Sequence, residues 1–182
     1  FLFYLCAAAA LSAASVHDTA VLSAGRIFVA NPEKLASASI KLPGLWEFYW
    51  NEFIDPALFY SGESSVPTSA KPEPYALVKV PSVWNDIVDE PEAKWGKGAA
   101  TYHIRLENLK PNFRYAMYMF DRIGTAGNLY CNGKLVFSQG TPSVNYKETR
   151  SRRSMDIAVL QSDADGIADL VFHCSNYVYR MG

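Results

Sequence analysis

Short segments in which apolar residues alternate with polar ones recur along most of this chain and constrain its fold more than any other feature. In residues 42–50, for example, Trp46, Phe48 and Trp50 fall on one side of an extended backbone. This period of two predicts a half-buried strand. The chain has no sustained helical period and no internal repeat. Because each sheet must cover its apolar face with another, we predict an all-β fold, an antiparallel β-sandwich.

The remaining strand signals are separated by turn residues. Asn132-Gly133 lies between two apolar runs and predicts a tight hairpin, since both residues tolerate a positive φ. We expect Trp46 and Tyr102 in the core. The other predicted strands are 75–80, 100–106, 113–120, 129–137 on both sides of that turn, 155–160 and 168–174. Residues 51–60 predict a brief helical turn, and the Ser- and Pro-rich residues 61–74 an irregular surface connection.

Composition excludes several classes of protein. Of the 182 residues, 49% are hydrophobic and 19% are charged, which excludes intrinsic disorder. The formal net charge of -1 argues against a nucleic-acid partner. No domain boundary is visible inside residues 40–182, so we predict one sandwich domain there, preceded by a linker or leading strand at 16–39.

The first fifteen residues, FLFYLCAAAALSAAS, form an apolar stretch that ends in small residues. This stretch is short for a bilayer span and is typical of the apolar part of a secretory signal peptide, with Ser12–Ala14 as a cleavage site. A buried N-terminal helix and a membrane anchor are the alternatives. We expect export, with the ordered chain beginning between residues 16 and 40.

Motifs for catalysis are absent from the sequence. It contains no nucleophile elbow, no phosphate-binding loop and no HExxH motif, so we expect neither an enzyme nor a cofactor. His103 and His173 are predicted as outward or cross-strand polar residues, and no metal site is expected. Cys131 and Cys174 fall at inward positions, either as two free buried thiols, which we favour, or as one bridge.

Aromatic residues beside loops are the main candidates for recognition. Trp95 and Tyr146 are flanked by polar residues, and a flat ring with hydrogen-bonding neighbours suits a sugar. Trp84 is either a similar ring or part of the core. The basic residues 147–153 either grip a carboxylate or phosphate or form a solvated loop. The candidate ligand residues are Trp84, Asn85, Trp95, Asp121, Arg122, Tyr146 and Arg150.

An ordered set of short motifs resembles a known family. The motifs are Gly44–Trp50, Val80–Trp84, Gly98–Tyr102, Asn128–Lys134, Gly140–Ser143 and Ser175–Tyr177. Together, over residues 40–182, they resemble the extracytoplasmic domain of bacterial receptors with seven transmembrane helices and diverse intracellular signalling modules. Similar motifs occur in the sugar-binding domain of glycoside hydrolase family 2. This sequence departs from the pattern at Ser82 and Val83, where a glycine often precedes the tryptophan.

The resemblance implies a galactose-binding-domain-like jelly roll that senses a ligand outside the membrane. It implies a carbohydrate or other small polar ligand, a downstream seven-helix membrane region and a cytoplasmic output module, with a homodimer as a further partner. The implied location is extracytoplasmic, either periplasmic or at the cell surface, with the whole protein tethered to the inner membrane. The alternatives are an accessory sugar-binding domain of a glycoside hydrolase and a protein-interaction module.

Overall fold

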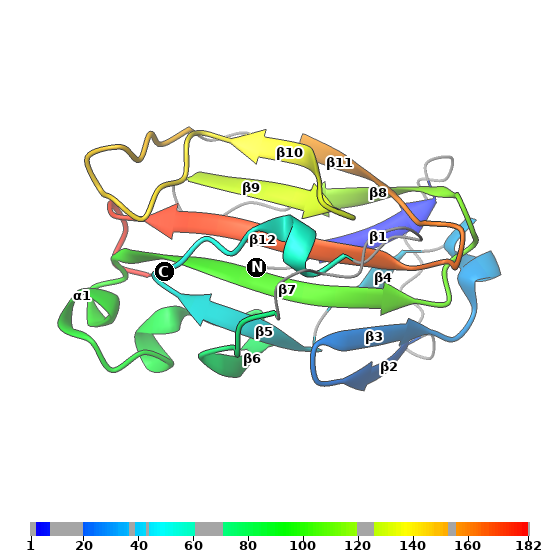
Figure 1. Ribbon diagram of the computed structural model, residues 1–182, viewed down its shortest axis with the longest axis horizontal. Helices are drawn as coiled ribbons and strands as arrows, with labels where there is room; N and C mark the ends of the chain where they lie inside the picture. Colours follow the sequence, from blue (N-terminus) through cyan, green and yellow to red (C-terminus); the bar gives the residue numbers. More distant parts are fainter. Residues whose placement is uncertain are drawn as a thin grey trace.

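The computed structural model describes residues 3–7, 20–36, 39–42, 44–60, 71–119, 126–152 and 156–181 and shows the predicted all-β sandwich. Two β-sheets form its layers, and the helices are short (Figure 1). The strands are β1 (Phe3–Ala7), β2 (Ala20–Ser23), β3 (Arg26–Val29), β4 (Ile40–Lys41), β5 (Gly44–Trp50), β6 (Ala76–Val80), β7 (Gly98–Glu107), β8 (Arg114–Met119), β9 (Ala126–Cys131), β10 (Lys134–Gln139), β11 (Asp156–Gln161) and β12 (Ala168–Asn176). The helices are η1 (Pro32–Ala36), η2 (Pro56–Leu58), η3 (Trp84–Asp86) and α1 (Pro91–Lys94).

The smaller sheet has the strand order β11-β8-β1-β4, and the main path of the larger one is β10-β9-β12-β7-β3-β2. Strand β7 is long enough to share one edge between two partners. Its first half pairs with β5, which also pairs with β6, and its second half pairs with β3. The pairing of β3 with β7 is parallel, whereas the other pairings are antiparallel.

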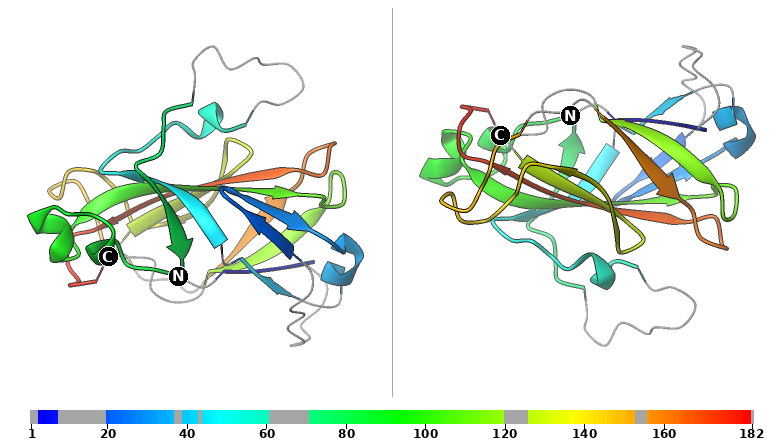
Figure 2. Two further views of the ribbon diagram at one scale, coloured as in Figure 1. Left: turned by 90° about the horizontal axis from the view of Figure 1, so that it is seen from below. Right: turned by 90° about the horizontal axis from the view of Figure 1, so that it is seen from above.

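Period-two burial fills the space between the sheets. Along β7, Tyr102, Ile104 and Leu106 face the core, and Trp46 and Phe48 of β5 do the same. The predicted core positions of Trp46 and Tyr102 are therefore confirmed. The other face of the larger sheet carries polar side chains and is covered by the segment around η2, which lies on the side of the sheet away from β1 and β8 (Figure 2).

The N-terminal residues depart from the expectation that the ordered chain begins after residue 15. Residues 3–7 form β1, which pairs with β8 on one side and β4 on the other. An unbroken apolar run is compatible both with a signal peptide and with a strand inside a sandwich, and periodicity does not separate the two. The removal of this segment on export remains a prediction. Residues 16–39, predicted as a linker or leading strand, include the two strands of the β2–β3 hairpin.

Two local predictions are confirmed. Asn132 and Gly133 form the β9–β10 turn with φ angles of 50° and 74°. Cys131 and Cys174 are free and buried, and burial raises the pKa of the Cys131 thiol to about 11. A thiol with so high a pKa carries little thiolate at neutral pH, so it acts as a core residue. In the part of the chain that the structure describes, no helix is long and apolar enough to cross a bilayer.

Candidate functional site

Loops from distant parts of the sequence converge at one end of the sandwich. The end of β5, the start of β7, α1, the β10–β11 loop and the residues after β12 meet there (Figure 1). The antiparallel register explains the meeting, because Gly98 at the start of β7 pairs with Asn176 at the end of β12. Together these segments line a cavity of about 660 Å³, which we call the loop-end pocket. Its lining residues are Trp50, Asn51, Glu90, Glu92, Lys97, Gly98, Val144, Asn145, Tyr146 and Tyr177.

Three aromatic rings line the loop-end pocket, and hydrogen bonds hold two of them. The Trp50 indole Nε1 donates to Glu90 Oε2 at 2.9 Å, and its ring packs edge-on against Trp84 at 5.4 Å. Tyr177 donates from its hydroxyl to Val144 O at 2.6 Å, which ties the end of β12 to the β10–β11 loop. Tyr146 is 64% exposed and lies 6.4 Å from Tyr177, centroid to centroid. The pocket therefore combines fixed rings with one exposed ring.

Charged and amide groups complete the pocket. Glu90 and Glu92 supply carboxylates from α1 and its N-cap, and Lys97 supplies an ammonium group. Asn51 and Asn145 add amide groups, although Asn145 Nδ2 donates to Glu148 within its own loop. Flat rings with directional donors and acceptors suit a polyhydroxylated ligand, whose ring face stacks while its hydroxyls find partners.

One of the predicted ligand residues that the structure describes lines the loop-end pocket, and others lie beside it. Of that set, Tyr146 lines the pocket. Trp95 follows α1 and is 58% exposed, but its ring lies under the Arg180 guanidinium at 5.5 Å and does not line the pocket. Asn85 donates to Lys94 O and Arg180 O, and so joins η3, α1 and the C-terminal segment. These residues build the end of the sandwich around the pocket.

The other predicted residues have different surroundings. Arg150 donates to Lys147 O and Thr149 O and so supports the β10–β11 loop. Trp84 is fully buried in the core, so its ring is withdrawn from any ligand at the surface. Asp121 and Arg122 lie outside the described residues. The sequence alone did not indicate Trp50, Glu90, Glu92, Lys97 or Tyr177 as ligand residues.

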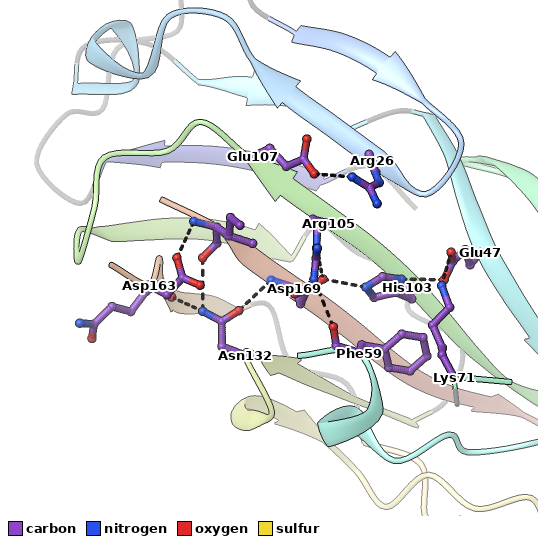
Figure 3. Close-up of polar contacts among 12 residues, drawn as sticks. Arg26, Glu47, Phe59, Lys71, His103, Arg105, Glu107, Asn132, Asp163 and Asp169 are labelled. Carbon is purple, nitrogen blue, oxygen red and sulfur yellow. Dashed lines mark hydrogen bonds and ion pairs between the residues drawn. The ribbon is translucent and has the colours of Figure 1, made fainter. Parts of the chain in front are cut away.

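A second polar cluster lies on the outer face of the larger sheet (Figure 3). His103 of β7 lies between two carboxylates, with Nδ1 2.8 Å from Glu47 Oε2 and Nε2 3.0 Å from Asp169 Oδ1. Only the doubly protonated imidazole donates to both. Arg105 grips Asp169 with two bonds of 2.9 and 2.8 Å, and Lys71 Nζ contacts Glu47 Oε1 at 2.6 Å. We call these five residues the outer-face network. It confirms His103 as a cross-strand polar residue.

The segment around η2 is fixed to this face. The Phe59 ring stacks on His103 at 4.2 Å, and Phe53 stacks on His173 at 4.6 Å. His173 Nε2 lies 2.8 Å from Ile54 O, and burial lowers the pKa of His173, which favours the neutral ring that donates one hydrogen bond there. Phe59 thus covers His103 of the outer-face network, whereas Phe53 and Ile54 cover the neighbouring His173. In the described parts of the chain, no cluster of His, Cys, Asp and Glu has the arrangement of a metal site.

Glu47 should make the stability depend on pH. Burial alone would raise its pKa, but hydrogen bonds and charges from His103 and Lys71 outweigh this and lower the pKa from 4.5 to about 2. A carboxyl with a lowered folded-state pKa stabilises the fold above its unfolded pKa, and the contribution is lost as pH falls toward the folded value. We expect Glu47 to account for about 2 kcal/mol lost between about pH 5 and pH 2, partial solvent screening included. Urea unfolding at several pH values measures this loss in the free energy of unfolding.

The matched variant for that experiment is Glu47→Gln, which keeps the shape and removes the charge. Its free energy of unfolding should be lower than that of the parent at pH 6, and the difference should disappear toward pH 2. A difference that stays constant over this range would mean that the Glu47 charge does not contribute.

Comparisons with known proteins give a likeness to solved structures. No family model matches the sequence, and no curated protein matches it. A β-glucuronidase of an uncultured Clostridium species is similar over 75% of this chain and 22% of its own, at 17% identity and a TM-score of 0.46. A Faecalibacterium prausnitzii β-glucuronidase is similar over 75% of this chain and 21% of its own, at 20% identity and a TM-score of 0.48. A Ruminococcus gnavus β-glucuronidase is similar over 74% of this chain and 20% of its own, at 19% identity and a TM-score of 0.45. This chain thus spans about a fifth of the length of each.

Proposed function

We propose that this domain binds a carbohydrate or similar small polar ligand in the loop-end pocket and has no catalytic role of its own. The observation that carries the proposal is the grouping of three rings, Trp50, Tyr146 and Tyr177, with two carboxylates and an ammonium group around one cavity. The volume of about 660 Å³ falls within the range of small-molecule sites. The rings offer stacking faces, and the charged groups offer hydrogen bonds to hydroxyls.

The proposed context is an extracytoplasmic sensor. In such a receptor the stiff sandwich carries the pocket, and a bound ligand favours one arrangement of the domain relative to the membrane region or a second copy. The motif resemblance supports this context. The same pocket would serve an accessory sugar-binding domain of a glycoside hydrolase. The sequence that follows the domain in the gene separates the two, because the sensor requires seven apolar spans and the hydrolase a barrel with paired glutamates.

Tyr146→Ala should abolish ligand binding in the loop-end pocket without loss of fold, because the ring is exposed and its removal leaves the core intact. We expect a neutral or amino monosaccharide at millimolar concentration to raise the melting temperature of the parent domain, since a bound ligand stabilises by mass action. The shift should be lost in Tyr146→Ala, with at least a tenfold weaker affinity by calorimetry. Glu92→Gln tests the polar side of the same pocket.

Trp95→Ala is the matched aromatic control. Its ring is comparably exposed at the same end, but lies outside the pocket. If Trp95→Ala loses the ligand and Tyr146→Ala keeps it, the stacking ring is Trp95, which follows α1, and the pocket is not the site. If no neutral, amino or acidic sugar stabilises the parent at about 10 mM, the small-ligand proposal fails for this domain.

A further inference from the structure

A second cavity of about 550 Å³ lies at the opposite end of the sandwich from the loop-end pocket. The register places it there, because the Leu106–Ala168 pair is at the other end of the β7–β12 ladder from Gly98–Asn176. The cavity opens between the β9–β10 turn and the β11–β12 loop, beside the first residue of β8, and we call it the far-end cleft. Cys131, Val136 and Val159 provide its apolar lining.

The loops that form the far-end cleft are fixed by hydrogen bonds within the protein. Asn132 donates to Gln161 O and Ile167 O and accepts from Asp169 N, so it joins three segments. Asp163 Oδ1 accepts from the backbone amides of Asp165 and Ile167. Ser162 accepts from Phe113 N. These side chains hold the cleft open in one shape, and a site that is already formed pays little ordering cost when a ligand enters.

Two cations and two carboxylates line the same cleft. Arg114, at the start of β8, and Lys134, at the start of β10, are exposed and make no ion pair or side-chain hydrogen bond with another described residue. Asp163 and Asp165 follow β11, and the Asp165 carboxylate likewise has no partner among the described residues. Charged groups that the fold leaves unpaired at a preformed cavity are available to a ligand.

The two positive and two negative side chains together determine which charges a ligand of the far-end cleft should carry. A purely anionic molecule would gain from Arg114 and Lys134 but be repelled by Asp163 and Asp165, and a purely cationic one would meet the reverse. A molecule with one carboxylate and one ammonium group satisfies both pairs, with the planar guanidinium of Arg114 suited to the carboxylate. Val136 and Val159 leave room for an apolar side chain.

We propose that the far-end cleft binds a small zwitterion, a free neutral α-amino acid, with Arg114 and Lys134 on its carboxylate and Asp165 and Asp163 on its ammonium group. This site is separate from the loop-end pocket and does not depend on it. The two cavities would allow the domain to respond to two chemically different ligands.

A matched set of three probes tests the charge requirement by calorimetry on the whole chain. L-leucine carries both charges, 4-methylpentanoate lacks the ammonium group, and 3-methylbutylamine lacks the carboxylate. We expect L-leucine to bind at millimolar concentration or below, and each of the other two at least tenfold more weakly. Equal binding by 4-methylpentanoate would overturn the zwitterion assignment, as would the absence of binding by neutral L-amino acids at about 10 mM.

Variants locate the site. Arg114→Ala and Asp165→Asn should each weaken L-leucine binding at least tenfold, because each removes one charged partner, and both side chains are exposed so that the fold is kept. Lys79→Ala is the control, since it removes an exposed cation on β6 away from the cleft. Binding that survives Arg114→Ala and Asp165→Asn but is lost in Tyr146→Ala would overturn the inference and place the amino acid in the loop-end pocket. Sugar binding in the Arg114→Ala variant should be unchanged.

Discussion

Replacing Asp169 with asparagine should lower the free energy of unfolding by about 3 kcal/mol, because it removes one partner of a buried ion pair. Asp169 is 1% exposed and accepts hydrogen bonds from His103 and twice from Arg105. Burial alone would raise the pKa of this carboxyl, but those bonds and charges lower it, so the ionised form stabilises the fold. Asparagine keeps the shape but leaves the Arg105 guanidinium without its ion-pair partner, and it removes one of the two carboxylates beside His103. Urea unfolding at neutral pH measures the loss.

The effect should extend to the segment that covers the outer-face network. Arg105 also donates to Phe59 O, and the Phe59 ring stacks on His103, so amide exchange of residues 53–59 should accelerate in Asp169→Asn. Glu107→Gln is the control, because it breaks the exposed ion pair with Arg26 and should cost under about 0.5 kcal/mol. Equal losses in the two variants would show that the buried carboxylate has no special role.

The parts of the fold that could be predicted are those in which neighbouring residues carry the signal. Alternation in β5 and β7 placed Trp46 and Tyr102 in the core, and Asn132-Gly133 specified its turn without reference to the rest of the chain. The β2–β3 hairpin is short, and β3 joins β7 in parallel, a pairing that no local pattern encodes. The apolar residues 3–7 satisfy the pattern of a signal peptide and of a strand equally well.

The sites were harder to predict because they consist of distant residues. His103 and Asp169 are 66 positions apart and meet only through the register of β7 and β12. Period two placed His103 on the outer face, but nothing local indicated that residues 53–59 cover it. Likewise the sequence indicated Tyr146 as a ligand residue because it is an aromatic residue in a polar loop, whereas the alternation in β5 predicts Trp50 as a core residue. Its role in lining the loop-end pocket appears only when β5, α1 and the end of β12 meet.

At the loop-end pocket, we expect the largest loss of folding stability when a single methyl group is added at Gly98. Its φ is +152°, and an added Cβ would lie 2.1 Å from the Trp50 ring, which itself packs against Trp84. We expect Gly98→Ala to cost about 3 kcal/mol, as backbone strain and overpacking add. The ring must also leave its bond to Glu90, so the indole fluorescence should change in the folded state. Chemical unfolding followed by fluorescence measures both.

Gly133→Ala is the reference for the cost of a positive φ without a steric contact. Gly133 also has a positive φ, 74°, but a Cβ there would meet nothing within 4 Å, so only the conformational cost of about 1 kcal/mol remains. A loss in Gly98→Ala no larger than that in Gly133→Ala would mean that Trp50 moves freely, and that the wall of the loop-end pocket is soft. A clearly larger loss, accompanied by a change in indole fluorescence, would mean that the added methyl group meets a Trp50 ring held as a wall, as a preformed ligand site requires.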